Sequence, residues 1–176
     1  MSWAIITPIL TAQVTKDIVL TTVSTTINAT SSLISYFINT NNVNINIFKN
    51  ELLHMDINNN LIIISSLIKD IIHKQSRIEM SATIYLKNRD ENDENILLPE
   101  PLKKAIFSTY EMIEKIRINL EDINLKITYH EQKYFKNWRN LDLTEEIKIL
   151  KMNNEIFKNR LNILLKLIKI YNVNKR

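Results

Sequence analysis

The most regular pattern of apolar and polar positions in the chain lies between Asp142 and Tyr171. Its apolar residues follow one another at alternating steps of three and four, apart from one place in the series, which Asn154 occupies. They are Leu143, Ile147, Leu150, Phe157, Leu161, Leu164, Ile168 and Tyr171. This heptad spacing predicts an amphipathic helix with one polar residue in its apolar seam.

A second stripe on the same predicted helix also repeats every seven residues. It consists of Ile149, Ile156, Ile163 and Ile170, and it lies about 100° around the helix from the row that contains Leu150. Two stripes make an apolar face wider than a two-stranded coiled coil needs, so we expect this helix to meet at least two neighbours in a bundle. Its opposite face is basic.

A similar helix precedes it. Ile106, Ile113, Leu120 and Ile127 repeat every seven residues from residue 102 onward, and asparagines at 137 and 140 indicate the end of the helix. Asp142 or Thr144 can then cap the last helix. The two final helices are therefore predicted to form an antiparallel hairpin.

The three-four rhythm also runs through the middle of the chain. It begins at Leu61 and continues to about residue 87, which predicts another long, well-buried helix. A shorter helix is expected around residues 47–57, and the run Asn58 to Asn60 is expected to mark the break between the two, since asparagine adopts left-handed backbone conformations readily.

The first segment is almost free of charge. Residues 3–48 contain only Lys16 and Asp17 as charged residues, and Thr7-Pro8 is a good helix start. Abundant Val, Ile and Thr would suit a strand, but the alternation is poor and no hairpin turn interrupts the run. We therefore expect a helix to about residue 38. The 21 uncharged residues 18–38 could reach across a bilayer, yet ten of them are Ser, Thr or Asn, which favours a helix packed in a bundle or oligomer over a transmembrane or interfacial one.

The predicted fold is all-α: an antiparallel helical bundle of about four to five helices within one domain, residues 1–176. Residues 1–88 hold the N-terminal helices, residues 89–101 an acidic linker with prolines, and residues 102–176 a basic helical hairpin. The linker carboxylates lack the glycine and the terminal glutamate of a calcium loop. We interpret the linker as a solvated acidic loop.

Composition excludes several kinds of chemistry. The chain has no cysteine, so disulfide scaffolds, Cys-ligated zinc and thiol catalysis are excluded. It has no glycine either, and most phosphate-cradling loops and nucleophile elbows depend on glycine. The surplus of Ile, Asn and Lys is typical of a low-GC genome, as in large DNA viruses of protists and in some AT-rich protists and bacteria. The start of the sequence lacks a secretory signal, which predicts an intracellular protein, with peripheral membrane association as an alternative.

Histidine and carboxylate spacing gives no convincing metal or catalytic site. Glu51 and His54 have the spacing of a carboxylate-bridged metal bundle, and Asp70 and His73 come near it, but the further inward glutamates of such a site are not evident. No catalytic residue, metal ligand or cofactor is predicted. We expect a protein that is not an enzyme.

Charge is divided unevenly along the chain. Residues 1–101 have 7 basic and 10 acidic groups, net −3, and residues 102–176 have 16 and 9, net +7. Cations alternate with aromatics near the predicted hairpin corner and continue along the last helix, giving candidate contacts for anions or lipid headgroups. These candidates are Lys133, Lys136, Trp138, Arg139, Lys148, Lys151 and Lys158. The alternative is that the aromatics close the corner and the cations favour the helix end.

The function expected from these patterns is that of a structural or protein-interaction bundle, self-associating or built into a larger assembly such as a virion. Candidate interface residues lie on the first and last helices: Leu20, Val23, Ile27, Ile34, Phe37, Asn154, Phe157, Leu161 and Leu164. Asn154 could specify register or partner number, or lie at a partly wet edge. Two alternatives are a membrane-associated protein that uses residues 3–38, with an anionic membrane as partner, and a nucleic-acid-binding bundle that uses the basic half.

Overall fold

The computed structural model describes residues 6–85, 99–133 and 141–173, without the side chains of residues 6–20, 44, 72, 74–85 and 173. Every regular element in these ranges is helical, which confirms the all-α prediction. The helices are α1 (Ile6–Asn39), α2 (Asn46–Met55), α3 (Ile57–Tyr85), α4 (Glu100–Glu131) and α5 (Thr144–Val173), and a short 3-10 turn, η1 (Val43–Ile45), precedes α2.

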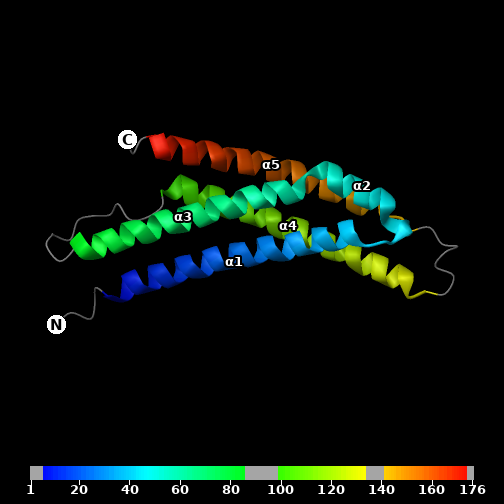
Figure 1. The fold of residues 1–176 in the computed structure, drawn as a ribbon, viewed down its shortest axis with the longest axis horizontal. Coiled ribbons are helices and arrows are strands. Elements are labelled where there is room, and N and C mark those ends of the chain that lie inside the picture. The colour runs from blue at the N-terminus through cyan, green and yellow to red at the C-terminus, as the bar shows by residue number, and fades with distance from the viewer. Residues whose placement is uncertain (1–5, 86–98, 134–140, 174–176) are drawn as a thin grey trace.

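The helices form an elongated four-cornered bundle (Figure 1). One corner is shared by α2 and α3, which together make a bent rod. Around the bundle, α4 packs against α1 and α5, and α3 packs against the same two helices. The helices α1 and α4 run in one direction and α3 and α5 in the other (Figure 1). Consecutive helices α3 and α4 therefore stand at diagonally opposite corners, and α4 with α5 forms the predicted hairpin.

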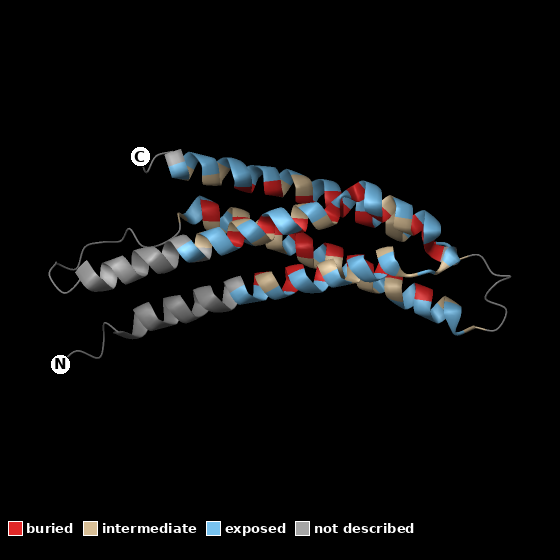
Figure 2. Ribbon diagram, in the orientation of Figure 1, coloured by how far each residue is buried: buried red, intermediate tan, exposed pale blue. Residues whose placement is uncertain are grey.

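Each helix buries one stripe, and the stripes meet along the long axis of the bundle (Figure 2). On α5 the buried positions include Leu150, Asn154, Phe157, Leu161 and Leu164, as the heptad pattern predicts. On α4 they are Leu102, Ile106, Thr109, Met112, Ile113, Ile116, Leu120, Ile123 and Ile127. The long predicted helices are confirmed, and so are their inner faces where the structure describes the side chains.

An aromatic pair fills the core where α1 ends and α2 begins. Phe37 and Phe48 are both fully buried, with ring centroids 5.0 Å apart and an interplanar angle of 85°. This edge-to-face arrangement adds to the hydrophobic gain of burying two large side chains. It anchors the turn through η1.

The break between α2 and α3 lies at Asp56, two residues earlier than predicted. Asp56 has a φ of 55°, in the left-handed region, while Asn58, Asn59 and Asn60 all belong to the first turn of α3. The asparagines take part in the break as hydrogen-bond donors: Asn59 Nδ2 donates to Asp56 Oδ1 (2.5 Å) and Asn60 Nδ2 donates to the Asp56 carbonyl (3.0 Å).

Packing explains why the break falls there. Both Met55 and Ile57 are buried in the core, yet residues two apart point about 200° away from each other on a continuous helix. A left-handed residue between them changes the direction of the chain, so that both side chains reach the interior. The prediction of a break at Asn58 to Asn60 was wrong because it relied on asparagine content and ignored this phase difference.

Both helices of the hairpin begin at residues suited to helix starts. Pro101 stands in the first turn of α4, where a missing backbone N–H costs nothing. Before α5, the Thr144 backbone N–H donates to Asp142 Oδ1 (2.9 Å), and this hydrogen bond lowers the pKa of the Asp142 carboxyl. Most of the predicted acidic linker, residues 89–98 of 89–101, and the predicted hairpin corner, residues 134–140, lie outside the described residues.

Candidate interaction surface

One row of α5 side chains binds α4. Arg160 Nη1 donates to the Ser108 carbonyl (2.6 Å) and lies 3.3 Å from Glu111 Oε2. One and two heptads earlier, Asn153 Nδ2 donates to Asn119 Oδ1, and Glu146 pairs with Lys126. These contacts, spaced by seven on α5, fix the register of the antiparallel hairpin.

The other flank of the α5 seam faces the bent rod. Lys151 Nζ lies 2.7 Å from Glu51 Oε2 on α2. Asn154 is 1% exposed, and its Nδ2 donates to the Met55 carbonyl (2.9 Å) at the end of α2. Asn154 thus satisfies one of the carbonyls that a helix end leaves without a partner. Its Oδ1 has no hydrogen-bond partner among the described residues.

The second isoleucine stripe of α5 is exposed. Ile149, Ile156, Ile163 and Ile170 are 40%, 37%, 55% and 53% exposed. We expected neighbouring helices to cover the wide apolar face of α5. The helix does contact two neighbours, α4 and the bent rod. The side chains that make these contacts, however, stand in the rows on either side of the seam and not in the isoleucine stripe. Because Glu146, Asn153 and Arg160 reach α4, the stripe three residues further along the helix is turned outward. We call Ile149, Ile156, Ile163 and Ile170 the outer stripe.

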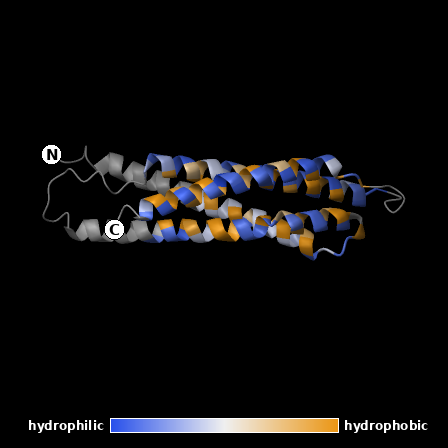
Figure 3. Ribbon diagram, turned by 90° about the horizontal axis from the view of Figure 1, so that it is seen from above, coloured by the Kyte–Doolittle hydropathy of each residue, from blue (hydrophilic) through white to orange (hydrophobic). Residues whose placement is uncertain are grey.

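The outer stripe belongs to a second seam-like pattern. Met152 (58% exposed), Asn159 and Lys166 lie between the isoleucines, so that exposed positions on this side of α5 again alternate by three and four. On the neighbouring helix α4, Ile118 and Leu125 are also exposed and seven residues apart. Hydrophobic residues recur along the helices (Figure 3), and these exposed positions place some of them on the outside of the bundle. Sequence reasoning missed Met152, Ile118 and Leu125, although their spacing was visible.

The predicted interface residues occupy the chain's own core. Phe157, Leu161 and Leu164 of α5 are buried, and so are the candidates on α1: Val23, Ile27, Ile34 and Phe37. The side chain of Leu20 lies outside the described residues. Asn154 is buried and hydrogen-bonded to the Met55 carbonyl. The described side chains of this set are taken up by contacts within the chain, and the apolar residues left accessible to another molecule are the exposed ones.

The outer side of α1 carries hydroxyl and amide groups in place of charges. Thr22, Thr25, Asn28, Ser32 and Ser35 are exposed there. Hydroxyls on a helix can be satisfied by the helix itself, and Thr25 Oγ1 donates to the Thr21 carbonyl (2.9 Å). An uncharged helix face of this kind can meet water without a covering partner, which removes one reason to expect it to be covered.

Most of the predicted anion contacts that the structure describes have an acidic partner. Lys151 pairs with Glu51, as described above. Lys158 Nζ lies 3.3 Å from Glu155 Oε1, and Lys148 Nζ lies 3.9 Å from Glu145 Oε2. Lys133 Nζ stands over the Tyr129 ring, 3.7 Å from its centroid. Lys136, Trp138 and Arg139 lie outside the described residues.

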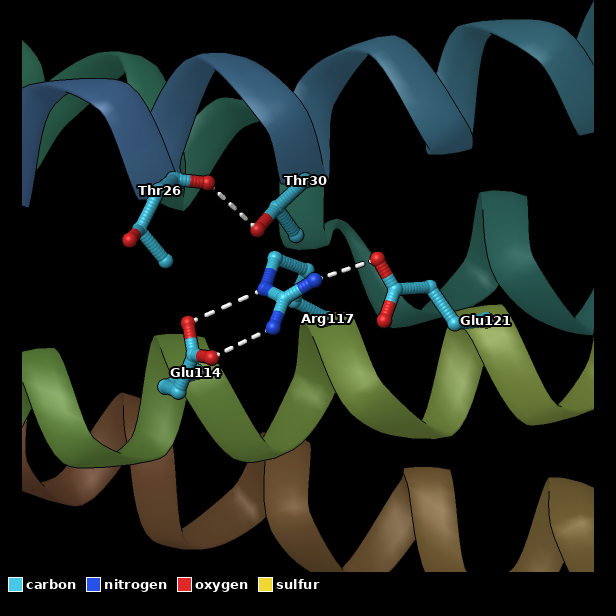
Figure 4. A network of polar contacts seen from close by, with 5 residues as sticks. All are labelled: Thr26, Thr30, Glu114, Arg117 and Glu121. Atoms are coloured by element: carbon cyan, nitrogen blue, oxygen red, sulfur yellow. Dashed lines mark hydrogen bonds and ion pairs between the residues drawn. The ribbon is translucent and has the colours of Figure 1, made fainter.

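A polar cluster joins α4 to α1 (Figure 4). Arg117 donates through Nε and Nη2 to the two carboxylate oxygens of Glu114 (3.0 and 2.5 Å) and through Nη1 to Glu121. The hydrogen bond from Arg117 lowers the pKa of Glu114. Opposite them, Thr30 is fully buried and donates to the Thr26 carbonyl (2.7 Å). A side-chain hydrogen bond between Thr26 of α1 and Glu114 of α4 also lowers the pKa of Glu114, and we interpret the cluster as a link between the two helices.

The residues whose spacing resembled a metal site do not come together in the structure. Glu51 is paired with Lys151, and His54, Asp70 and His73 are exposed. Within the described ranges no three His, Asp or Glu side chains come together in a way that could hold a metal ion.

The uncharged segment of α1 was considered for a membrane span. In the part of the chain that the structure describes, no helix combines the length and the apolar character that crossing a bilayer requires.

Comparison of the chain with protein-family models, with curated proteins and with solved structures gives no match.

Proposed function

We propose that this protein is a non-enzymatic structural bundle that acts through protein contacts, as a self-associating subunit. The observation that carries the proposal is the outer stripe of α5. The bundle completes a continuous core without these four isoleucines, and they remain 37–55% exposed. Exposed apolar groups in register over several turns are the usual mark of a protein interaction site.

The size of the stripe supports this interpretation. From Ile149 to Ile170 it extends over 21 residues, about 32 Å at 1.5 Å per residue, and one helix face is about 10 Å wide. The helix face that carries the stripe thus covers roughly 300 Å², about the size of the largest apolar patch on a typical monomeric protein, which often serves an interaction.

The two alternative functions have less support. Nucleic-acid or anionic-lipid binding depends on positive potential, and Lys148, Lys151 and Lys158 each lie near a carboxylate of the chain, which offsets part of their attraction for an anion. The apolar side chains considered for membrane contact on α1, among them Val23, Ile27 and Ile34, are buried in the bundle.

Sedimentation velocity of the whole chain over a wide concentration range tests the proposal. We expect the sedimentation coefficient to rise with concentration, and we expect Ile163→Lys to suppress this rise because it places a charge in the stripe. The matched control is Ile62→Lys, an isoleucine 58% exposed on α3, which should associate as the wild type does. A wild-type chain that stays monomeric at every concentration would refute the proposed function.

A further inference from the structure

The outer stripe has one open flank. The row Glu146, Asn153 and Arg160 on one side of it contacts α4. The row on its other side consists of Lys148, Glu155, Asn162 and Lys169, also seven residues apart, and all four are exposed. A helix laid on the stripe would therefore lie beside this second row, which we call the open flank.

The spacing of the stripe calls for a helical occupant. Side chains that alternate by three and four along a helix provide the knobs and holes that another helix of the same period fills. The chain itself has such a helix, because α5 presents this pattern outward from residue 149 to residue 170. A twofold pair of identical chains would use the surface of α5 twice.

The charges of the open flank distinguish among antiparallel pairings. A twofold axis perpendicular to α5 sets each residue of the flank opposite a residue of the same flank in the other copy. An axis centred on Glu155 would place this carboxylate against Glu155 of the second copy, so that two like charges would meet. Centred between Glu155 and Asn162, it would place Lys148 against Lys169. Centred on Asn162, it places Glu155 against Lys169 twice and Asn162 against Asn162, so that the charge pairs between described residues of the flank are all attractive.

A parallel pairing of the stripe is unfavourable. It would stack Lys166 on the same residue of the other copy within the seam, and Glu145 on its counterpart as well. Like charges in direct contact oppose association. The helix dipoles would also lie side by side in the same direction, whereas antiparallel helices bring opposite ends together.

We propose that α5 pairs with α5 of a second copy in antiparallel orientation, with the twofold axis at Asn162 and reciprocal Glu155–Lys169 ion pairs along the open flank. In this register the seam residues lie within two positions of direct opposition, with Met152 packed against Ile170 of the second copy and Asn159 against Ile163. The aliphatic part of Lys166 covers Ile156 while its ammonium reaches water. The inference rests on the proposed function, since it specifies the partner and the geometry of self-association.

The expected contact is small. A face of roughly 300 Å² on each copy is less than the ~800 Å² that each partner buries in a standard stable interface. The pair is therefore an equilibrium between monomer and dimer. Such a contact depends noticeably on its ion pairs, and their exposed positions make it sensitive to salt.

Charge reversal tests the ion pairs. Glu155→Lys and Lys169→Glu each turn two attractive contacts into like-charge contacts, and each is expected to weaken association about fivefold or more. The double variant Glu155→Lys/Lys169→Glu recreates the pairs with exchanged partners and should restore association. Asp70→Lys, an exposed residue of α3, makes the same change of charge elsewhere and should have no effect. The readout is the dimer dissociation constant from sedimentation.

Single cysteines test the orientation, and they are easily interpreted because the chain has none of its own. Asn162→Cys lies at the proposed twofold axis and should give cross-linked dimers with a short bis-maleimide reagent, whereas Ile149→Cys should not. The opposite pattern, which a parallel pair would give, overturns the inference. So does a double charge variant that associates no better than the single variants. If the wild type associates but the charge variants or the cross-links contradict the antiparallel pair, the proposed function is retained and this pairing geometry is refuted. If the wild type is monomeric, both the proposed function and the pairing geometry are refuted.

Discussion

At the scale of single residues, the bundle depends on a few polar side chains whose partners lie on other helices. Asn154 is the clearest example. Its position in the heptad series could be predicted, but the sequence offered two interpretations, a determinant of partner number or a wet edge, and neither names Met55. The hydrogen bond to the Met55 carbonyl exists because α2 ends there. A heptad pattern alone does not reveal where a neighbouring helix ends.

Replacement of Asn154 by aspartate isolates the role of this donor. The substitution keeps the shape of the side chain but places a second acceptor, and a buried charge, against the Met55 carbonyl. We expect Asn154→Asp to lower the free energy of unfolding by more than about 2 kcal/mol at neutral pH, as measured by urea denaturation. Asn162→Asp on the exposed side of α5 is the control and should change it by less than about 0.5 kcal/mol. An Asn154→Asp variant as stable as this control would show that the donor is dispensable.

The ionisation of Glu114 makes the stability that the cluster between α1 and α4 contributes depend on pH. Its pKa in the folded protein is lowered from 4.5, chiefly by the hydrogen bond from Arg117. A carboxyl with a depressed pKa stabilises the fold fully above its unfolded value and loses this contribution as pH falls through the folded value. We therefore expect Glu114→Gln to lower the free energy of unfolding by about 1 kcal/mol near neutrality.

The same variant should differ less from the wild type in acid. As pH falls through 4.5, the unfolded chain begins to bind a proton at Glu114 and the advantage of the wild type shrinks. The two urea unfolding curves should therefore converge as pH falls further, through the lowered pKa of Glu114 in the folded protein. A difference between the two proteins that does not change with pH would contradict this account of the cluster.

At the scale of helices, the break at Asp56 shows how two apolar series become joined. Phe48, Leu52 and Met55 form one series, and Ile57 and Leu61 belong to the next. The second series is two residues out of phase with the first, and this offset was readable in the sequence. It could have located the break better than the asparagine run did, because burial decides where the backbone must turn.

Backbone conformation at Asp56 gives a direct prediction. The left-handed backbone conformation is about 1–2 kcal/mol less favourable for a β-branched residue than for aspartate. Asp56→Val should therefore lower the free energy of unfolding by at least this amount. Asp70→Val, within the regular part of α3, changes only helix propensity and should cost a few tenths of a kcal/mol. Thermal unfolding followed by circular dichroism compares the two. Equal midpoints for the two variants would argue that the break tolerates any residue.

At the same scale, the two stripes of α5 could both be predicted but their environments could not. The seam with Leu150, Phe157 and Leu164 and the outer stripe with Ile156 and Ile163 have the same period. The difference between them arises from Glu146, Asn153 and Arg160, which contact α4 in place of the second stripe. Periodicity identifies apolar rows, whereas the choice of the row that is covered depends on the neighbouring helix.

At the scale of the whole molecule, the helical class, the long helices and the terminal hairpin were accessible from the sequence, because heptad spacing is a strong local signal. The ring order α1, α4, α5 and α3 was not. Contacts between α1 and α4 join residues far apart in the chain, and the apolar faces alone permit other arrangements. The proposed pairing of two copies also belongs to this scale, since its orientation and register depend on the order of charges along the entire α5 helix.

The packing of α1 on α4 has a consequence for synthesis on the ribosome. About 90 residues separate the end of α1 from the end of α4, so at about 5–20 residues per second the first helix waits roughly 5 to 20 seconds for the complete partner. Its hydroxyl-rich side needs no protection in that interval, and Phe37 already meets Phe48 of α2. The apolar side chains of α1, among them Val23, Ile27 and Ile34, lack the cover that α4 supplies until α4 has emerged. Ribosome pausing ahead of residue 131 would prolong that exposure.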